Sequence, residues 1–191
     1  KLNKELPDEI FIKKIYDESS YTAAKFSELY TSFSLAIFFV LSFSLFFLGL
    51  RSAIVVTAIL PFSVSLVLFG CNLIGLPLHM TSMSGIIIAL GLLIDNGIIV
   101  VEDYKHRRSL GLSPNAAIKV SVNHLVAPLA AATATTVFAF LPIVTGEGSS
   151  IEFVGGLAKT VIMSIVSSLI LALIAVPVMM TYLEKVKFLN R

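Results

Sequence analysis

Five long apolar segments constrain the fold of this chain more than any other feature. They lie at about 32–50, 53–75, 80–101, 125–145 and 156–183. A helix needs about 20 predominantly apolar residues to cross the hydrocarbon core of a bilayer. Inside lipid every backbone polar group must be hydrogen-bonded within the protein, which favours helices for segments of this length. We therefore predict an all-α membrane protein built around a bundle of five transmembrane helices.

The composition supports this prediction and excludes several functions. Hydrophobic residues make up 57% of the chain and charged residues 14%, which is too apolar for a soluble domain of this length. The net charge is +2 and the basic residues do not form a dedicated patch, so we expect no nucleic-acid partner. A single cysteine, Cys71, excludes an internal disulfide and a cysteine metal cluster. The three histidines lie far apart, and we expect neither a metal site nor an enzyme.

The segments that flank the five spans are polar. Residues 1–18 surround a strand-like run at 10–16, which we expect to complete a sheet in a domain outside the membrane. Because the chain begins with Lys1, we interpret it as a piece of a longer protein. Over 19–33 apolar residues recur at helical spacing, which predicts an amphipathic interfacial helix that runs into the first span. The bundle then occupies 34–184, and 185–191 form a tail.

The distribution of basic residues predicts the orientation of the bundle. The short loops at 76–79 and 146–152 contain no lysine or arginine. Cytoplasmic loops carry an excess of these residues, so the opposite side is expected to be cytoplasmic, with the N-terminus outside and the C-terminus inside. The basic residues assigned to the cytoplasmic side are Arg51, Lys105, Arg107, Arg108, Lys119, Lys185, Lys187 and Arg191.

Asp95 and Asn96 interrupt the third apolar segment. A carboxylate in the middle of a bilayer costs roughly 2.5–3.5 kcal/mol on insertion scales, and such residues commonly serve ion or proton traffic. Two interpretations follow: Asp95 is a titratable group in a proton pathway, or it hydrogen-bonds a neighbouring helix. We expect Gly91 and Gly97 to allow close helix packing. On a continuous helix one stripe contains Ser84, Ile88, Gly91, Asp95, Ile98 and Glu102.

Hydroxyl side chains in the last two spans are weaker candidates. Thr133, Thr135 and Thr136 in the fourth span are expected either to support a proton-carrying water chain or to bond the preceding helical turn. For the three serines of the fifth span, at 164, 167 and 168, we favour close helix packing. Glu102 and Asp103, followed by basic residues, are interpreted as an interfacial cluster of opposite charges.

The motif GLLIDNGIIVVED at 91–103 strongly resembles the fourth transmembrane helix of the resistance–nodulation–division (RND) superfamily, acriflavine-resistance type. The likeness extends along the whole chain. LPDEIFIKKIYDE and the residues up to Ser32 resemble the end of the first periplasmic porter region and the linker into helix two. The stretch 50–97, from LRSAIVV to LLIDNG, resembles helices two to four. APLAAATATTVFAFLPIVTGEGSS and GGLAKTVIMSIVSSL resemble helices five and six. The five spans would therefore be helices two to six of the first repeat.

The resemblance implies a proton-driven exporter of small molecules in the bacterial inner membrane. Asp95 would be the acid that exchanges protons with a lysine of the second repeat. Asn96 would replace the second acid of the multidrug pumps, which leaves the number of protons per cycle open. The implied partners are membrane lipid, the rest of the same transporter, two further copies in a homotrimer, a periplasmic adaptor and an outer-membrane channel. Protons would be the coupling ion, and no cofactor is implied.

Other functions remain open from the sequence. The five-helix unit of sterol-sensing proteins resembles the same run, which allows a lipid- or sterol-binding sensor. Accessory proteins of protein export share the acid in helix four, although the motif at 91–103 fits them less well. A purely structural role is the last alternative. Loss of export on removal of the Asp95 carboxylate would favour the exporter, whereas proton-independent lipid binding would favour the sensor.

Overall fold

The computed structural model describes residues 18–76, 80–146 and 148–185, and these are almost entirely helical. The expected all-α bundle is confirmed within these residues. The strand expected at 10–16 lies outside them. The six helices are α1 (Glu18–Leu48), α2 (Leu50–Leu73), α3 (Met80–Leu92), α4 (Asp95–Ser109), α5 (Pro114–Thr145) and α6 (Ser149–Lys185).

Five stretches of these helices are long and apolar enough to cross a membrane, and α3 and α4 together form the third of them. The helices extend past the apolar segments that predicted them. α5 begins at Pro114 instead of near 125, because proline at the first helical position is compatible with a helix start. The interfacial helix expected at 19–33 is continuous with the first span in α1. The five stretches are Phe26–Leu48, Leu50–Leu73, Thr81–Ser109, Pro114–Thr145 and Val154–Glu184.

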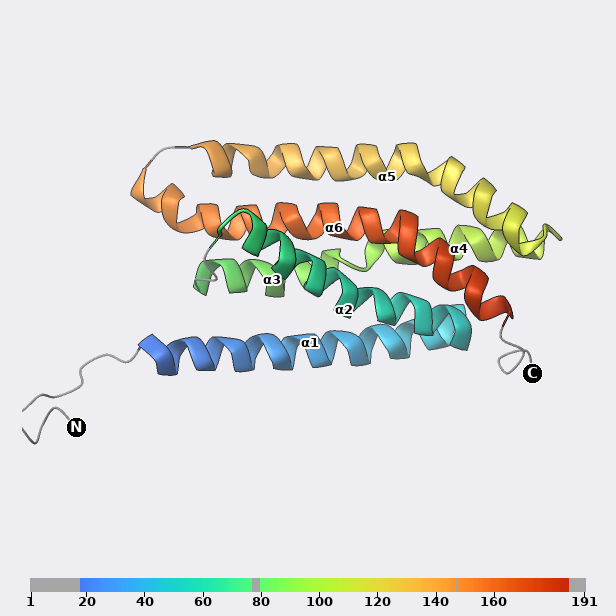
Figure 1. Ribbon diagram of the computed structural model, residues 1–191, viewed down its shortest axis with the longest axis horizontal. Coiled ribbons are helices and arrows are strands. Elements are labelled where there is room, and N and C mark those ends of the chain that lie inside the picture. Colours follow the sequence, from blue (N-terminus) through green and yellow to red (C-terminus); the bar gives the residue numbers. More distant parts are fainter. Residues whose placement is uncertain (1–17, 77–79, 147, 186–191) are drawn as a thin grey trace, which may run out of the picture.

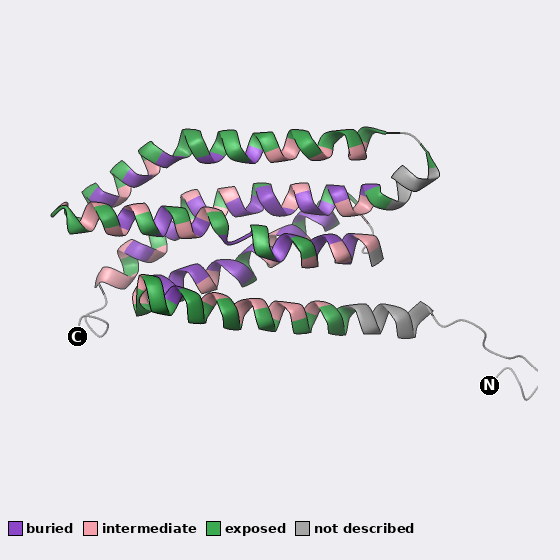
Figure 2. Cartoon of the chain, turned by 180° about the vertical axis from the view of Figure 1, so that it is seen from behind, coloured by how far each residue is buried: buried purple, intermediate pink, exposed green. Residues whose placement is uncertain are grey.

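α6 lies at the centre of the bundle and packs against α2, α3, α4 and α5, whereas α1 packs against α2 and α3 (Figure 1). Most of the main apolar core comes from α2, α4 and α6. α1 and α5 carry long exposed faces (Figure 2). On α1 these faces present Phe38, Phe39 and Phe46. Large apolar side chains on an outer face are expected where lipid is the solvent.

Two tight turns and the end of α6 lie at the same end of the bundle (Figure 1). Gly49 joins α1 to α2 with φ +76°, and Gly111 follows α4 with φ +89°. These left-handed conformations favour glycine. The arrangement brings Arg51, at the start of α2, to the same end as the basic last turn of α4. Of the basic residues that the sequence assigned to one side, Arg51, Lys105, Arg107 and Arg108 thus lie at one end of the bundle.

Candidate functional site

Asp95 is the first residue of α4 and follows a two-residue interruption at Leu93 and Ile94. The sequence predicted one continuous helix over 80–101, and this detail is wrong. Aspartate and asparagine have low propensity for helix interiors and are favoured near helix starts, which accounts for a break at this point. The interruption is small, since Ile94 keeps right-handed dihedrals and its carbonyl accepts the N–H of Ile98 at 3.0 Å.

A serine of α6 holds the interruption in place. The hydroxyl of Ser168 donates a hydrogen bond to the carbonyl oxygen of Leu93 at 2.6 Å. The side-chain amide of Asn96 donates to the same hydroxyl at 3.3 Å. Ser168 is fully buried, so the broken helix is bonded to its neighbour where water is excluded. From the sequence, Ser168 was expected to serve close helix packing, and its bond to Leu93 was not foreseen. The available signal was a group of serines in one apolar segment and a polar pair in another.

Asp95, unlike Asn96, is exposed on the surface of the bundle. It lies at the middle of the third span, Thr81–Ser109, with fourteen residues on either side. Ile88 and Ile99 on the same face are 56% and 41% exposed. After the interruption the exposed stripe continues through Ile99 and Glu102, and not through Ile98 as expected for a continuous helix. An acid at mid-span is therefore surrounded by apolar side chains that the described residues leave uncovered.

The two glycines of the motif lie in different environments. A Cβ atom at Gly97 would lie 2.5 Å from Cδ1 of Ile59 on α2, so α2 and α4 approach closely there. A Cβ atom at Gly91 would meet no described heavy atom within 4 Å. Gly91 is exposed on the same side as Asp95. The close packing expected at Gly91 therefore does not occur within the described residues.

Within the described part of the chain, the three candidate threonines of α5 form no hydrogen bond with Asp95. Thr135 and Thr136 donate to the carbonyl oxygens of Ala131 and Ala132 at 2.9 and 3.0 Å, one turn back along the helix. Thr133 is buried. A role for these three residues in a water chain stays a prediction.

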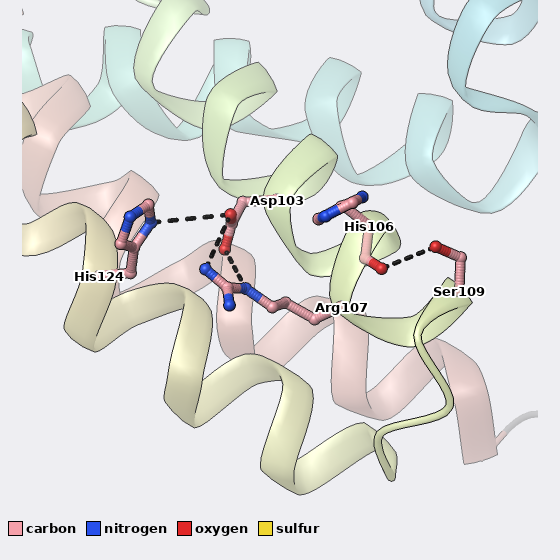
Figure 3. A network of polar contacts seen from close by, with 5 residues as sticks. All are labelled: Asp103, His106, Arg107, Ser109 and His124. Carbon is pink, nitrogen blue, oxygen red and sulfur yellow. Dashed lines mark hydrogen bonds and ion pairs between the residues drawn. The ribbon is translucent and has the colours of Figure 1, made fainter.

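A second polar region lies at the end of α4 (Figure 3). The carboxylate of Asp103 accepts hydrogen bonds from Arg107 at 3.3 and 3.4 Å and faces Nδ1 of His124 on α5 at 3.7 Å. Glu184 on α6 accepts bonds from Tyr104 at 2.6 Å and from Arg108 at 2.9 Å. These contacts connect the end of α4 to α5 and α6. Among the described residues no group of three potential metal ligands is found.

Comparison with known proteins matches the model of the AcrB/AcrD/AcrF family to residues 1–187. The chain is 30% identical over 127 residues to the swarming motility protein SwrC of Bacillus subtilis (strain 168), covering 66% of this chain and 12% of that protein. It is 27% identical over 183 residues to the multidrug resistance protein MdtC of Serratia proteamaculans (strain 568), covering 95% of this chain and 18% of the relative. It is 28% identical over 194 residues to the putative cation efflux system protein SilA of Salmonella typhimurium, again covering 95% and 18%.

The chain therefore spans less than a fifth of the length of these relatives. The similarity nonetheless runs through all five spans and through the Asp95 motif, because the family model covers nearly the whole chain. The chain belongs to the AcrB/AcrD/AcrF family of RND efflux transporters.

Proposed function

We propose that this chain forms the proton-coupling part of an RND exporter of small molecules, with Asp95 as the group that takes up and releases the proton. The observation that carries the proposal is the position of Asp95: it is a carboxyl group at mid-span, on an uncovered apolar face. Placing such a group against lipid is costly, so its presence there favours a functional role. Its place in the first turn of α4 also puts it at the positive end of a helix dipole.

The coupling would follow from electrostatics. A deprotonated Asp95 attracts a cation on a facing element, and protonation removes that attraction. The cation is expected from a part of the transporter beyond this chain, as the family resemblance implies. Gly91 on the same face leaves room for that element to approach. Loss of the ion pair would let the helices repack, and the change would pass along α1 toward the N-terminal segment.

Asn96 is proposed as an anchoring residue of the relay. It cannot ionise, and its amide donates to Ser168, so it fixes the start of α4 while the neighbouring carboxyl remains free to face a partner. A single ionisable group would then carry the proton on this helix. This arrangement supports one titrating acid at this point of each transporter copy.

The wider setting of the proposal comes from the family. The chain would lie in the bacterial inner membrane with its N-terminus periplasmic and its C-terminus cytoplasmic, in agreement with the basic residues at one end. The complete protein would act as a homotrimer with a periplasmic adaptor and an outer-membrane channel. The relatives' names mention multidrug resistance and cation efflux, so the exported substance is expected among small organic molecules or metal ions.

The test uses the full-length protein that contains these residues. A wild-type strain is first screened with dyes, metal cations and organic solvents to find a substance that it exports. Export is then measured for Asp95→Asn, which removes the titratable group at constant size. We expect it to fall to the level of a strain without the transporter, at unchanged protein abundance in the membrane.

Glu102→Gln is the matched control, because Glu102 lies two turns along the same exposed stripe but near the membrane boundary. We expect this variant to retain export. Export by Asp95→Asn at the wild-type level would contradict the proposal and would favour the lipid-sensor alternative.

A further inference from the structure

A pocket opens at the end of the bundle where the turn between α1 and α2 meets α4 and α6. Its volume is about 320 Å³. This is within the usual range of about 300–1,000 Å³ for small-molecule sites. Its charged lining comes from Arg51 on α2, Lys105 and Arg108 on α4, and Glu184 on α6. Met180 and Leu183 supply part of its apolar wall. The Asp95 site does not include any of these residues.

The charges of the lining are unequal, because three cations face one carboxylate. Glu184 is engaged by Arg108 at 2.9 Å and by the hydroxyl of Tyr104. Lys105 donates to the carbonyl oxygen of Leu48 at 2.7 Å, which uses one of the three donors of its ammonium group. The lining side chains therefore carry a net positive charge.

The start of α2 adds backbone donors to the same wall. Gly49, Leu50, Arg51 and Ser52 all line the pocket, and they include the first turn of a 24-residue helix. Gly49 precedes this helix and has no side chain to cap it. The first N–H groups of a helix have no partner within it, and they sit at the positive end of its dipole. Backbone and side chains therefore favour the same kind of ligand, an anion.

We propose that this pocket binds a phosphate group, in the form carried by the headgroup of an anionic phospholipid. The pocket lies at the end of membrane-length helices, where headgroups are found. Its wall joins cations to leucine and methionine side chains, which suits a headgroup together with the first part of its acyl chains. Basic pockets between transmembrane helices are the usual sites for such headgroups. The site would connect the α1–α2 turn to α4 and α6 through one ligand.

The test is native mass spectrometry of the full-length protein, titrated with phosphatidylglycerol in detergent. Lys105→Gln removes a cation from the pocket. Lys119→Gln is the matched control, because it makes the same substitution at an exposed position of α5. We expect Lys105→Gln to weaken binding of the first lipid by about fivefold to tenfold, from the loss of one cation. Lys119→Gln should bind as the wild type does.

Two further variants separate charge from folding. Lys105→Arg should restore binding if the positive charge is what the ligand contacts, and Arg51→Gln should weaken it by removing the cation on α2. Inorganic phosphate is added as a competitor: displacement of the lipid at millimolar phosphate supports the phosphate site and assigns it to the free anion, and no displacement supports it as a lipid site. Equal lipid affinity in Lys105→Gln, Arg51→Gln and Lys119→Gln would overturn the proposal.

Discussion

Asp95 and Asn96 are neighbours in the sequence, yet their side chains meet different surroundings. Asn96 turns toward α6 and bonds Ser168, whereas Asp95 is exposed on the outer face. The presence of an acid at mid-span could be predicted, because a charge within a long apolar segment is visible in the sequence. The partner of Asn96 could not be predicted, because the bond depends on how α6 is rotated against α4. Neighbouring residues of a helix point in directions about 100° apart, so only one of the pair can face α6.

Gly97 is a second single residue with a specific role: it is predicted to be required for the packing of α2 on α4. Alanine there would place its Cβ against Cδ1 of Ile59, which is buried and has little room to move. Overpacking costs about 1–3 kcal/mol, partly offset by the higher helix propensity of alanine, about 1 kcal/mol. We expect Gly97→Ala to lower the free energy of unfolding by about 1 kcal/mol, measured by denaturant titration of the purified protein.

Ile59→Val removes the opposing Cδ1 and should rescue most of the loss in the double variant. Gly155→Ala is the control, because the nearest atom to its Cβ would be a carbonyl oxygen at 4.0 Å. If Gly97→Ala is as stable as Gly155→Ala, the close approach of α2 and α4 is not maintained in the protein.

The elements of the fold were largely predictable, and their ends were not. Hydrophobic length identifies each stretch that crosses the membrane, so five spans follow from the sequence. A helix continues beyond the apolar region wherever its backbone bonds can still form, as α5 does from Pro114 and α4 does to Ser109. The interruption at Leu93 was hidden for another reason: it contains neither proline nor glycine, and it is stabilised by a hydroxyl from a helix 75 residues away.

The Ser168 hydroxyl is predicted to stabilise the interruption between α3 and α4. In Ser168→Ala the carbonyl of Leu93 loses its bond in a buried place where water does not replace it, and Asn96 loses its acceptor. A typical hydrogen bond contributes about 0.5–1.5 kcal/mol. We expect the amides at 94–97 to exchange hydrogen about threefold to tenfold faster, measured by hydrogen–deuterium exchange in nanodiscs.

Ser164→Ala is the matched control one turn earlier on α6. Ser164 is equally buried, but its hydroxyl donates to Thr160 within its own helix. Its removal should leave exchange at 94–97 unchanged. Equal acceleration in both variants would show that α6 packing in general, and not the bond to Leu93, holds the interruption.

For the whole molecule, the uncovered face around Asp95 determines whether the proposed coupling can operate. An acid that faces lipid has no cation to release, whereas an acid under a second part of the transporter has one. The chain spans less than a fifth of its relatives, and the proposal assigns that face to the remaining part. Ile99 on α4 and Phe46 on α1 are both exposed in the described structure, at 41% and 83%, so the described residues leave both positions uncovered.

In the full-length transporter, Ile99 should be covered by protein and Phe46 should remain exposed to lipid. Spin labels are attached to cysteines introduced at Ile99, at Phe46 and at Phe138, which is 67% exposed on α5. The buried Cys71 of the full-length transporter is replaced by alanine. Labels at Phe46 and Phe138 should collide freely with dissolved oxygen, which concentrates in lipid, and the label at Ile99 should be shielded severalfold. If Ile99 is as accessible as both phenylalanine positions, no protein element covers Asp95. The ion pair on which the proposed coupling depends would then have no second member, and Asp95 would be left to a role at the lipid surface.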